Sequence, residues 1–182
     1  MANNDSTPRT RSRKTYESDD ATQAVASTAT KDIVVKDVDP TQYVTVRNGF
    51  QGRLVYRSKR TGERFVWDSF GAEQEIELRE LKNAKNSNKN FFINNWFMFD
   101  EDWIPEYLGV RQYYKNAISI EHFDDIFKKK PAELKKIIDG LSNGQKKSVA
   151  YRAKELIANK QIDSLSVIST LEESLGIELI EK

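Results

Sequence analysis

Residue types that commonly perform catalysis are scarce in this sequence. General acid–base chemistry near neutral pH most often uses histidine, and the chain has one, His122. A lone histidine beside Phe123, at the start of an expected helix, is more typical of a surface residue than of a metal ligand. The absence of cysteine excludes disulfides, thiolate nucleophiles and cysteine-based zinc sites. We therefore expect no cofactor and no metal ion.

Adjacent carboxylates include Glu101 and Asp102, Asp124 and Asp125, and Glu172 and Glu173. Neighbouring side chains on a helix point in different directions, so none of these pairs is a ready-made catalytic dyad. No phosphate-binding glycine-rich loop, nucleophile elbow or dinucleotide fingerprint occurs, and Gly49 and Gly52 are typical of turns. The sequence thus predicts no catalytic residues and a chain that is not an enzyme.

Basic residues gather near the C-terminal end, although the formal net charge of the whole chain is only +1. Ten lysines and arginines accompany three acids between residues 128 and 160, a local excess of seven. Such a face could neutralise several phosphates of duplex DNA, and its binding would then depend on salt. The alternative is that these side chains cover the solvated faces of short helices. The candidate DNA contacts are Lys128, Lys129, Lys130, Lys135, Lys136, Lys146, Lys147 and Arg152.

Aromatic residues provide a second candidate surface. Nine of them lie between residues 91 and 114, and all three tryptophans lie between residues 43 and 109. A small domain is expected to bury most of these rings and to leave the others as a protein–protein contact, in which Trp and Tyr are common anchors. The candidate interface residues are Trp96, Phe97, Trp103, Tyr107, Tyr113 and Tyr114.

The first 32 residues are predicted to be a disordered arm. They are rich in Ser, Thr, Asn, Asp and Ala, and too little apolar area is present to offset about 1–2 kcal/mol of backbone entropy per residue. A basic cluster in this arm could bind phosphate or an acidic protein surface; the alternative is a solvated tail of mixed charge. The candidate arm contacts are Arg9, Arg11, Arg13 and Lys14.

Residues 33–112 are expected to position the aromatic side chains in a small antiparallel β-domain, SH3-like or a half-barrel. Residues 43–46, 54–56 and 64–67 have strand signals and short connections, which predict a three-stranded meander. Residues 75–81 alternate apolar and charged types, which favours a fourth strand, with a short helix as the competitor. Further along, a loop or frayed helix end is expected at residues 83–90, a strand within residues 91–99 and a helical turn at 101–109.

Residues 113–182 change to a helical period and are expected to form a bundle of short helices. Four helices are predicted. Ser119 is expected to cap the first, Pro131 to start the second and Asn143-Gly144 to end it. The third is expected at residues 145–158, and the fourth between a cap at Asp163 or Ser164 and Gly176. The expected fold class is therefore α+β, with an arm, a β-domain and a helical subdomain.

Hydropathy gives no sign of a membrane partner. No apolar run approaches the roughly 20 residues that a membrane span needs, and the polar start of the chain lacks the apolar core of a secretory signal. We therefore expect the chain to be made and used in a cytoplasm.

Five runs of the chain carry a resemblance to a known family: VTVRNGFQGRLVYRSKRTGERFVWDSFG, QEIELRELKNAKNS, FFINNWFMFD, YLGV and AKELIANKQIDSLSVISTLEESLGIELIE. They resemble the short virion-associated structural proteins of tailed bacteriophages. The resemblance covers about residues 41–182 and brings no catalytic residues. It implies a structural or assembly protein of the capsid or head–tail region, made in the host cytoplasm and located in the virion. Its implied partners are other virion structural proteins in a symmetric multi-copy assembly.

Overall fold

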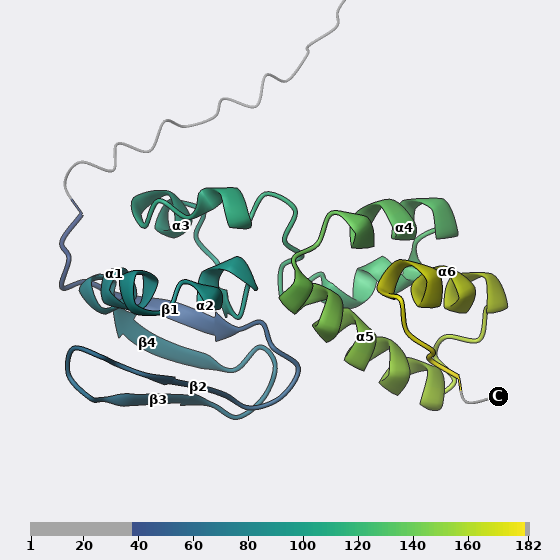
Figure 1. Ribbon diagram of the computed structural model, residues 1–182, viewed down its shortest axis with the longest axis horizontal. Helices are drawn as coiled ribbons and strands as arrows, with labels where there is room; N and C mark the ends of the chain where they lie inside the picture. The colour runs from purple at the N-terminus through teal and green to yellow at the C-terminus, as the bar shows by residue number, and fades with distance from the viewer. Residues whose placement is uncertain (1–37, 181–182) are drawn as a thin grey trace, which may run out of the picture. The chain divides into compact units, whose positions relative to one another are not determined.

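The structure is a computed structural model that describes residues 38–180. The predicted arm of residues 1–32 and its candidate contacts Arg9, Arg11, Arg13 and Lys14 lie outside the described residues. The described residues belong to one compact unit, in which a small antiparallel β region is followed by C-terminal helices (Figure 1). This confirms the predicted α+β class.

Two antiparallel sheets make up the β region (Figure 1). The strands of the described chain are β1 (Tyr43–Asn48), β2 (Leu54–Arg57), β3 (Arg64–Trp67), β4 (Glu73–Glu77) and β5 (Phe97–Met98). One sheet has the order β4-β1-β5, and β2 pairs with β3 in the other. The predicted strands at residues 43–46, 54–56 and 64–67 are therefore confirmed, but their pairing differs from the expectation.

The expected meander is wrong because β1 pairs with β4 and β5 and not with β2. The buried side chain of Asn48, at the end of β1, fixes the loop that follows. Its Nδ2 donates to the carbonyl oxygens of Gly52 and Ser69 at 2.7 and 2.8 Å, and its Oδ1 accepts from the amide of Phe50. Gly52 in this loop has a φ of 135°, and the chain then enters a separate hairpin.

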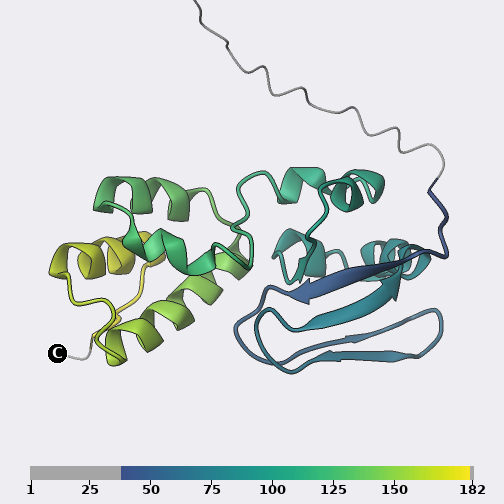
Figure 2. The ribbon, with the colours of Figure 1, turned by 180° about the vertical axis from the view of Figure 1, so that it is seen from behind.

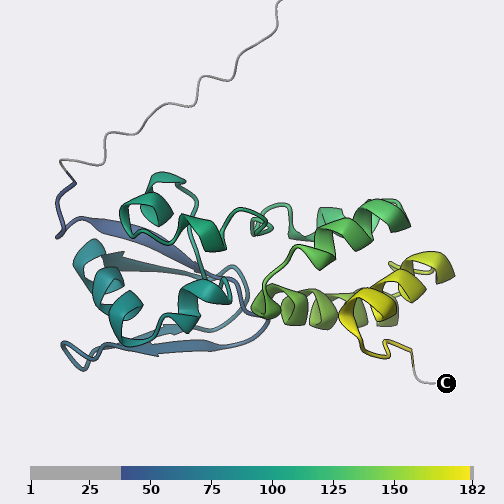
Figure 3. The same cartoon turned by 45° about the horizontal axis from the view of Figure 1, so that its top comes forward.

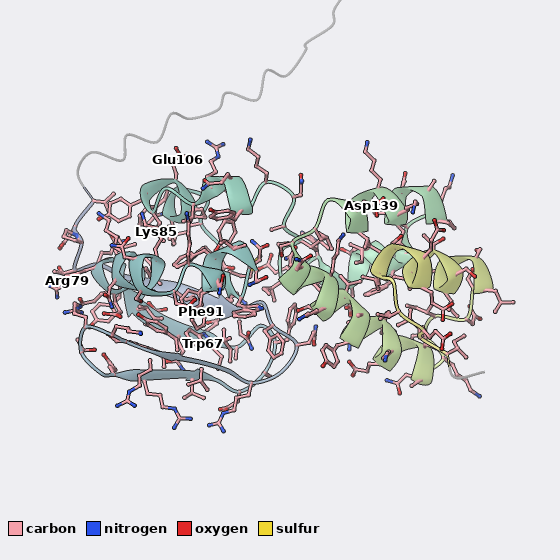
Figure 4. All side chains as sticks on the ribbon, viewed as in Figure 1. Trp67, Arg79, Lys85, Phe91, Glu106 and Asp139 are labelled. Carbon is pink, nitrogen blue, oxygen red and sulfur yellow. The ribbon has the colours of Figure 1, made fainter. Side chains whose placement is uncertain are left out.

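The β2–β3 hairpin is fixed to the first sheet through its inner side. Leu54 lies opposite Trp67, and Tyr56 lies opposite Phe65. Trp67 is fully buried between the two sheets, where its Nε1 donates to the carbonyl oxygen of Val46 in β1 at 2.8 Å (Figure 4). The alternation of the strands leaves the other side of this hairpin facing solvent.

Both alternatives for residues 75–81 occur in succession, because β4 ends at Glu77 and α1 (Leu78–Ser87) begins at the next residue. Leu78, Leu81 and Ala84 recur every three residues and are fully buried. The helix therefore extends to Ser87, into the segment 83–90 where a loop or a frayed helix end was expected. Figure 3 shows α1 and α2 (Asn90–Ile93) succeeding one another beside the sheet.

The apolar run at residues 91–99 is not one strand. It contains most of α2, then Asn95 in a left-handed turn with a φ of 53°, and then the short β5. The predicted helical turn after it is confirmed as α3 (Trp103–Tyr107), which is followed by Gly109 at a φ of 65°. A 3-10 turn, η2 (Arg111–Tyr113), completes this part of the chain.

The C-terminal part is helical, as predicted. Its elements are η3 (Phe123–Lys128), α4 (Pro131–Asp139), α5 (Asn143–Ala158) and α6 (Leu165–Leu175). The first is a 3-10 helix preceded by His122 and not capped by Ser119. Figures 1 and 2 show α4 lying beside α6, consistent with the many contacts between these helices.

The sequence suggested that Asn143 and Gly144 end α4, but they do not. They begin α5, because Ser142 accepts a hydrogen bond from the amide of Gln145 and caps that helix. Pro131 at the first position of α4 and Gly176 after α6, at a φ of 66°, are confirmed. Residues 177–180 form no strand.

The described unit contains two hydrophobic clusters, one in the β region and one among the C-terminal helices. The predicted domain boundary after residue 112 is not a clean division between them. Tyr113 and Tyr114 pack on the first cluster, whereas the ring of Phe70 from the β region contacts that of Phe123 of the second in a tilted arrangement, at 4.8 Å between ring centroids. The boundary therefore stays a prediction.

Candidate functional site

The predicted aromatic interface residues belong to the core of the β region. Phe97 is completely buried, with the rings of Trp67 and Phe91 at 5.3 and 4.6 Å from its own centroid. Its assignment as a contact residue is therefore wrong, because no partner can reach it. The other five are only partly accessible and pack against the same cluster: Trp96, Trp103, Tyr107, Tyr113 and Tyr114.

Tyr114 shows how these half-buried rings are held. Its hydroxyl donates to the carbonyl oxygen of Phe97 at 2.8 Å, and burial raises the pKa of its phenol well above the ordinary value. Trp103 is fixed in a similar way, because its indole nitrogen donates to the carboxylate of Glu101. The aromatic block therefore braces the β region more than it presents rings to solvent.

Replacing Phe97 by alanine tests this assignment. We expect Phe97→Ala to lower the free energy of unfolding by about 3–5 kcal/mol, since it opens a cavity in a close-packed aromatic cluster. Chemical denaturation of the purified chain measures the change. A loss below about 1 kcal/mol would contradict the core assignment.

Glu80 in α1 is the most deeply buried carboxylate among residues 38–180, with 3% of its surface exposed. Its Oε1 accepts hydrogen bonds from the hydroxyl of Tyr56 at 2.6 Å and from Nδ2 of Asn83 at 2.9 Å. Its Oε2 accepts from Nε of Arg60 at 3.0 Å. These donors tie α1 to β2 and to the turn of the hairpin.

The electrostatics of Glu80 are those of a structural charge. Burial alone would raise the pKa of its carboxyl, but the hydrogen bonds from Tyr56, Asn83 and Arg60 outweigh it, so the pKa is lowered. Burial and the adjacent carboxylate raise the pKa of the Tyr56 hydroxyl. Glu80 is therefore a fixed anion without a free proton, which is unsuited to general acid catalysis.

Arg152 in α5 is held by two acids and is not a free cation. Its Nε and Nη2 lie 2.9 and 2.5 Å from the two oxygens of Asp124, and its Nη1 lies 2.7 Å from Glu155. These bonds raise the pKa of the guanidinium further above its ordinary value. The adjacent acids Asp124 and Asp125 have different partners, since Asp125 contacts His122 and Lys128.

The Arg152–Asp124 pair lines a hollow of about 500 Å³, whose other walls include Gln51, Asp68 and Phe70. No group of three or more histidine, aspartate or glutamate side chains that could hold a metal ion was found between residues 38 and 180. The walls of the hollow are thus both polar and apolar, and the charges of Arg152 and Asp124 within it are already paired.

The structure divides the eight candidate DNA contacts into two groups. Lys128 and Lys135 join Arg152 in being paired, with Asp125 and Glu173 at 2.9 and 3.1 Å. The other five have no ion-pair partner in the described part of the chain: Lys129, Lys130, Lys136, Lys146 and Lys147. The local positive excess is thus smaller than the sequence count, and a DNA contact by these lysines stays a prediction.

A face that the sequence analysis missed is the outer side of the β2–β3 hairpin. Residues 53, 55 and 57 are exposed and alternate with the buried positions of β2. Along β3, residues 64 and 68 are exposed and Val66 between them is half-buried. The signal was present in the sequence, because Arg53, Val55 and Arg57 alternate with Leu54 and Tyr56, but these charged residues received no functional interpretation there. None of the described helices is long and apolar enough to cross a membrane.

Comparison with known proteins gave no match. No family model matches the chain, and no curated protein or solved structure is significantly similar to it.

Proposed function

We propose that this chain is a non-enzymatic structural protein of a tailed-phage particle, which binds neighbouring virion subunits. The observation that carries the proposal is that the clusters of charged residues join separate elements of the fold. Glu80 ties α1 to the β2–β3 hairpin, and Arg152 ties α5 to η3. Ion pairs between segments that are far apart in the sequence hold those segments in fixed relative positions. A subunit that must keep its shape within an assembly requires such rigidity.

A third cluster has the same character. Arg47 in β1 lies 3.0 Å from Glu73 in β4 and 2.8 Å from Asp100, which follows β5. These pairs raise the pKa of its guanidinium and connect all three strands of the first sheet. The resemblance of the chain to virion-associated proteins supports the same class of function. Under this proposal the contacts come from the β-domain and from the arm of residues 1–32.

The proposal predicts that the chain is a component of purified phage particles. Quantitative mass spectrometry of gradient-purified virions should find it at a constant ratio to the capsid protein, and deletion of residues 1–32 should lower that ratio. Recovery of the full chain only in the soluble fraction of the infected cell would overturn the proposal. An unchanged ratio after the deletion would contradict only the role proposed for the arm.

A further inference from the structure

The outer side of the β2–β3 hairpin carries three cross-strand pairs in a row. Strand register places Val55 opposite Val66 and Arg57 opposite Arg64. Arg53 and Asp68 continue the same face as an exposed ion pair at 3.4 Å between Nε and Oδ1. The face thus consists of an apolar pair with charged residues at both ends. We call these six residues the hairpin face.

The pairing of Arg57 with Arg64 is unfavourable within the free protein. Side chains directly opposite one another in an antiparallel pair lie about 4.5–5.5 Å apart at Cβ, and like charges in such positions repel. Both arginines are exposed, and neither has an ion-pair partner among residues 38–180. Within the part of the chain that the structure describes, their guanidinium groups form a single hydrogen bond, from Nε of Arg57 to the carbonyl oxygen of Gly62 at 3.3 Å.

The other arginine of this hairpin differs in a useful way. Arg60 is directed to the buried carboxylate of Glu80 and has a structural role. Arg57 and Arg64 have no such role, and Val55 beside them leaves 40% of its surface in water. Figure 4 shows the side chains of the hairpin extending into solvent on the side away from Trp67. The hairpin face is therefore the place where an external anion would relieve an existing repulsion.

We infer that the hairpin face binds an acidic segment of a partner protein, whose carboxylates pair with Arg57 and Arg64 and whose apolar side chain covers Val55 and Val66. Guanidinium groups bind carboxylates in a two-pronged geometry. Arginine with an apolar centre is typical of protein–protein interfaces, whereas the phosphate backbone of a nucleic acid has no apolar group to place on the valines. The acidic segment would belong to a neighbouring virion subunit, and only this identification of the partner rests on the proposed function.

The test uses the full chain and does not depend on phage particles. A short synthetic peptide in which glutamate alternates with valine and threonine is titrated into the ¹⁵N-labelled protein, and amide shifts are followed by NMR. We expect shifts at the amides of the hairpin face. The double variant Arg57→Glu with Arg64→Glu should bind the peptide at least about tenfold more weakly, with its other amide signals unchanged.

The matched control reverses the same number of charges elsewhere, with Lys115→Glu and Lys154→Glu, and should bind as the unchanged chain does. Arg57→Ser with Arg64→Ser serves if the glutamate variant does not fold. A peptide with glutamine in place of glutamate should not shift the hairpin. Equal binding of that peptide, a stronger response of the hairpin face to a short DNA duplex, or no response to the acidic peptide would each overturn the inference. The presence of the chain in virions would be unaffected by these results.

Discussion

Gly144→Ala should destabilise the chain by at least about 3 kcal/mol, although alanine is the better helix former. Gly144 lies in the first turn of α5, where helix propensity alone would favour alanine by about 1 kcal/mol. A Cβ at this position would lie 2.1 Å from the carbonyl oxygen and 2.5 Å from the Cβ of Asn94. Since the first contact is with backbone, no side-chain rotation can relieve it, and the helix would have to move.

The expected loss corresponds to a fall of about 6–12 °C in the melting temperature of a chain of this size. Gly140→Ala is the matched control. Gly140 follows α4 at a φ of −82°, and an added Cβ would meet Asn116 and Ile137 only at ordinary contact distances of 3.4–3.6 Å. That variant should be neutral or slightly more stable. Equal melting temperatures for the two alanine variants would contradict the close approach at Gly144.

The turn at residues 94–96 also lies close to a second glycine, Gly49. A Cβ at Gly49 would lie 2.1 Å from the carbonyl oxygen of Asn95, and the amide of Gly49 donates to the carbonyl oxygen of Trp96 at 2.8 Å. Ser148 of α5 donates its hydroxyl to the carbonyl oxygen of Gly49 at 2.9 Å. The loop after β1, the turn before β5 and the start of α5 therefore meet at residues 49, 94–96 and 144–148, where only glycine leaves room for the backbones.

Local patterns predicted the elements of this fold better than their connections. The β-branched and aromatic runs at residues 43–46, 54–56 and 64–67 are strands, since their types suit a half-buried pleated surface. The loop after β1 is fixed by the side chain of Asn48, which bonds to the carbonyl oxygen of Ser69, 21 residues away. Nothing in the local sequence distinguishes that asparagine from an ordinary turn residue, so the meander was the natural but wrong prediction.

Functional surfaces were predictable only in part, for a similar reason. The count of nine aromatic residues suggested more rings than a small domain could hide, but three of them are buried and the other six are half-buried against the same cluster, which includes the short helices at residues 90–93 and 103–107. The lysine-rich segment was correctly placed on helices, whereas the pairing of Lys135 with Glu173 and of Arg152 with Asp124 requires contacts between elements. Glu80 was read as part of an amphipathic strand because its buried partners, Tyr56 and Arg60, are 20 or more residues away.

Removing the charge of Glu80 should produce the second large effect, and that effect should depend on pH. Glu80→Ala would leave the Tyr56 hydroxyl, Asn83 and Arg60 without their shared acceptor, which we expect to cost about 3–5 kcal/mol at neutral pH. Glu80→Gln retains the shape but directs an amide donor at these donors, so its cost should be about 1–3 kcal/mol.

The sign of the pH dependence follows from the lowered pKa of Glu80. A carboxyl whose pKa is lower in the folded state than its ordinary value of 4.5 contributes its stability above that pH. The contribution is lost as the pH falls through the folded-state pKa. The difference in unfolding free energy between the unchanged chain and Glu80→Gln should therefore be constant near neutrality and shrink below about pH 4.5. Other carboxyls with lowered pKa, such as Asp125, are common to both proteins and cancel in this difference.

Denaturant titrations of both proteins at several pH values between 7 and 3 measure this difference. Glu106→Gln is the matched control, because Glu106 forms an exposed pair with Arg111 and its loss should change stability by no more than about 0.5 kcal/mol. A difference between the unchanged chain and Glu80→Gln that stays the same at acid pH would show that Glu80 acts through shape and not through charge. A cycle with Tyr56→Phe separates the two further: a coupling of about 1 kcal/mol or more is expected, because the 2.6 Å bond between these side chains is buried.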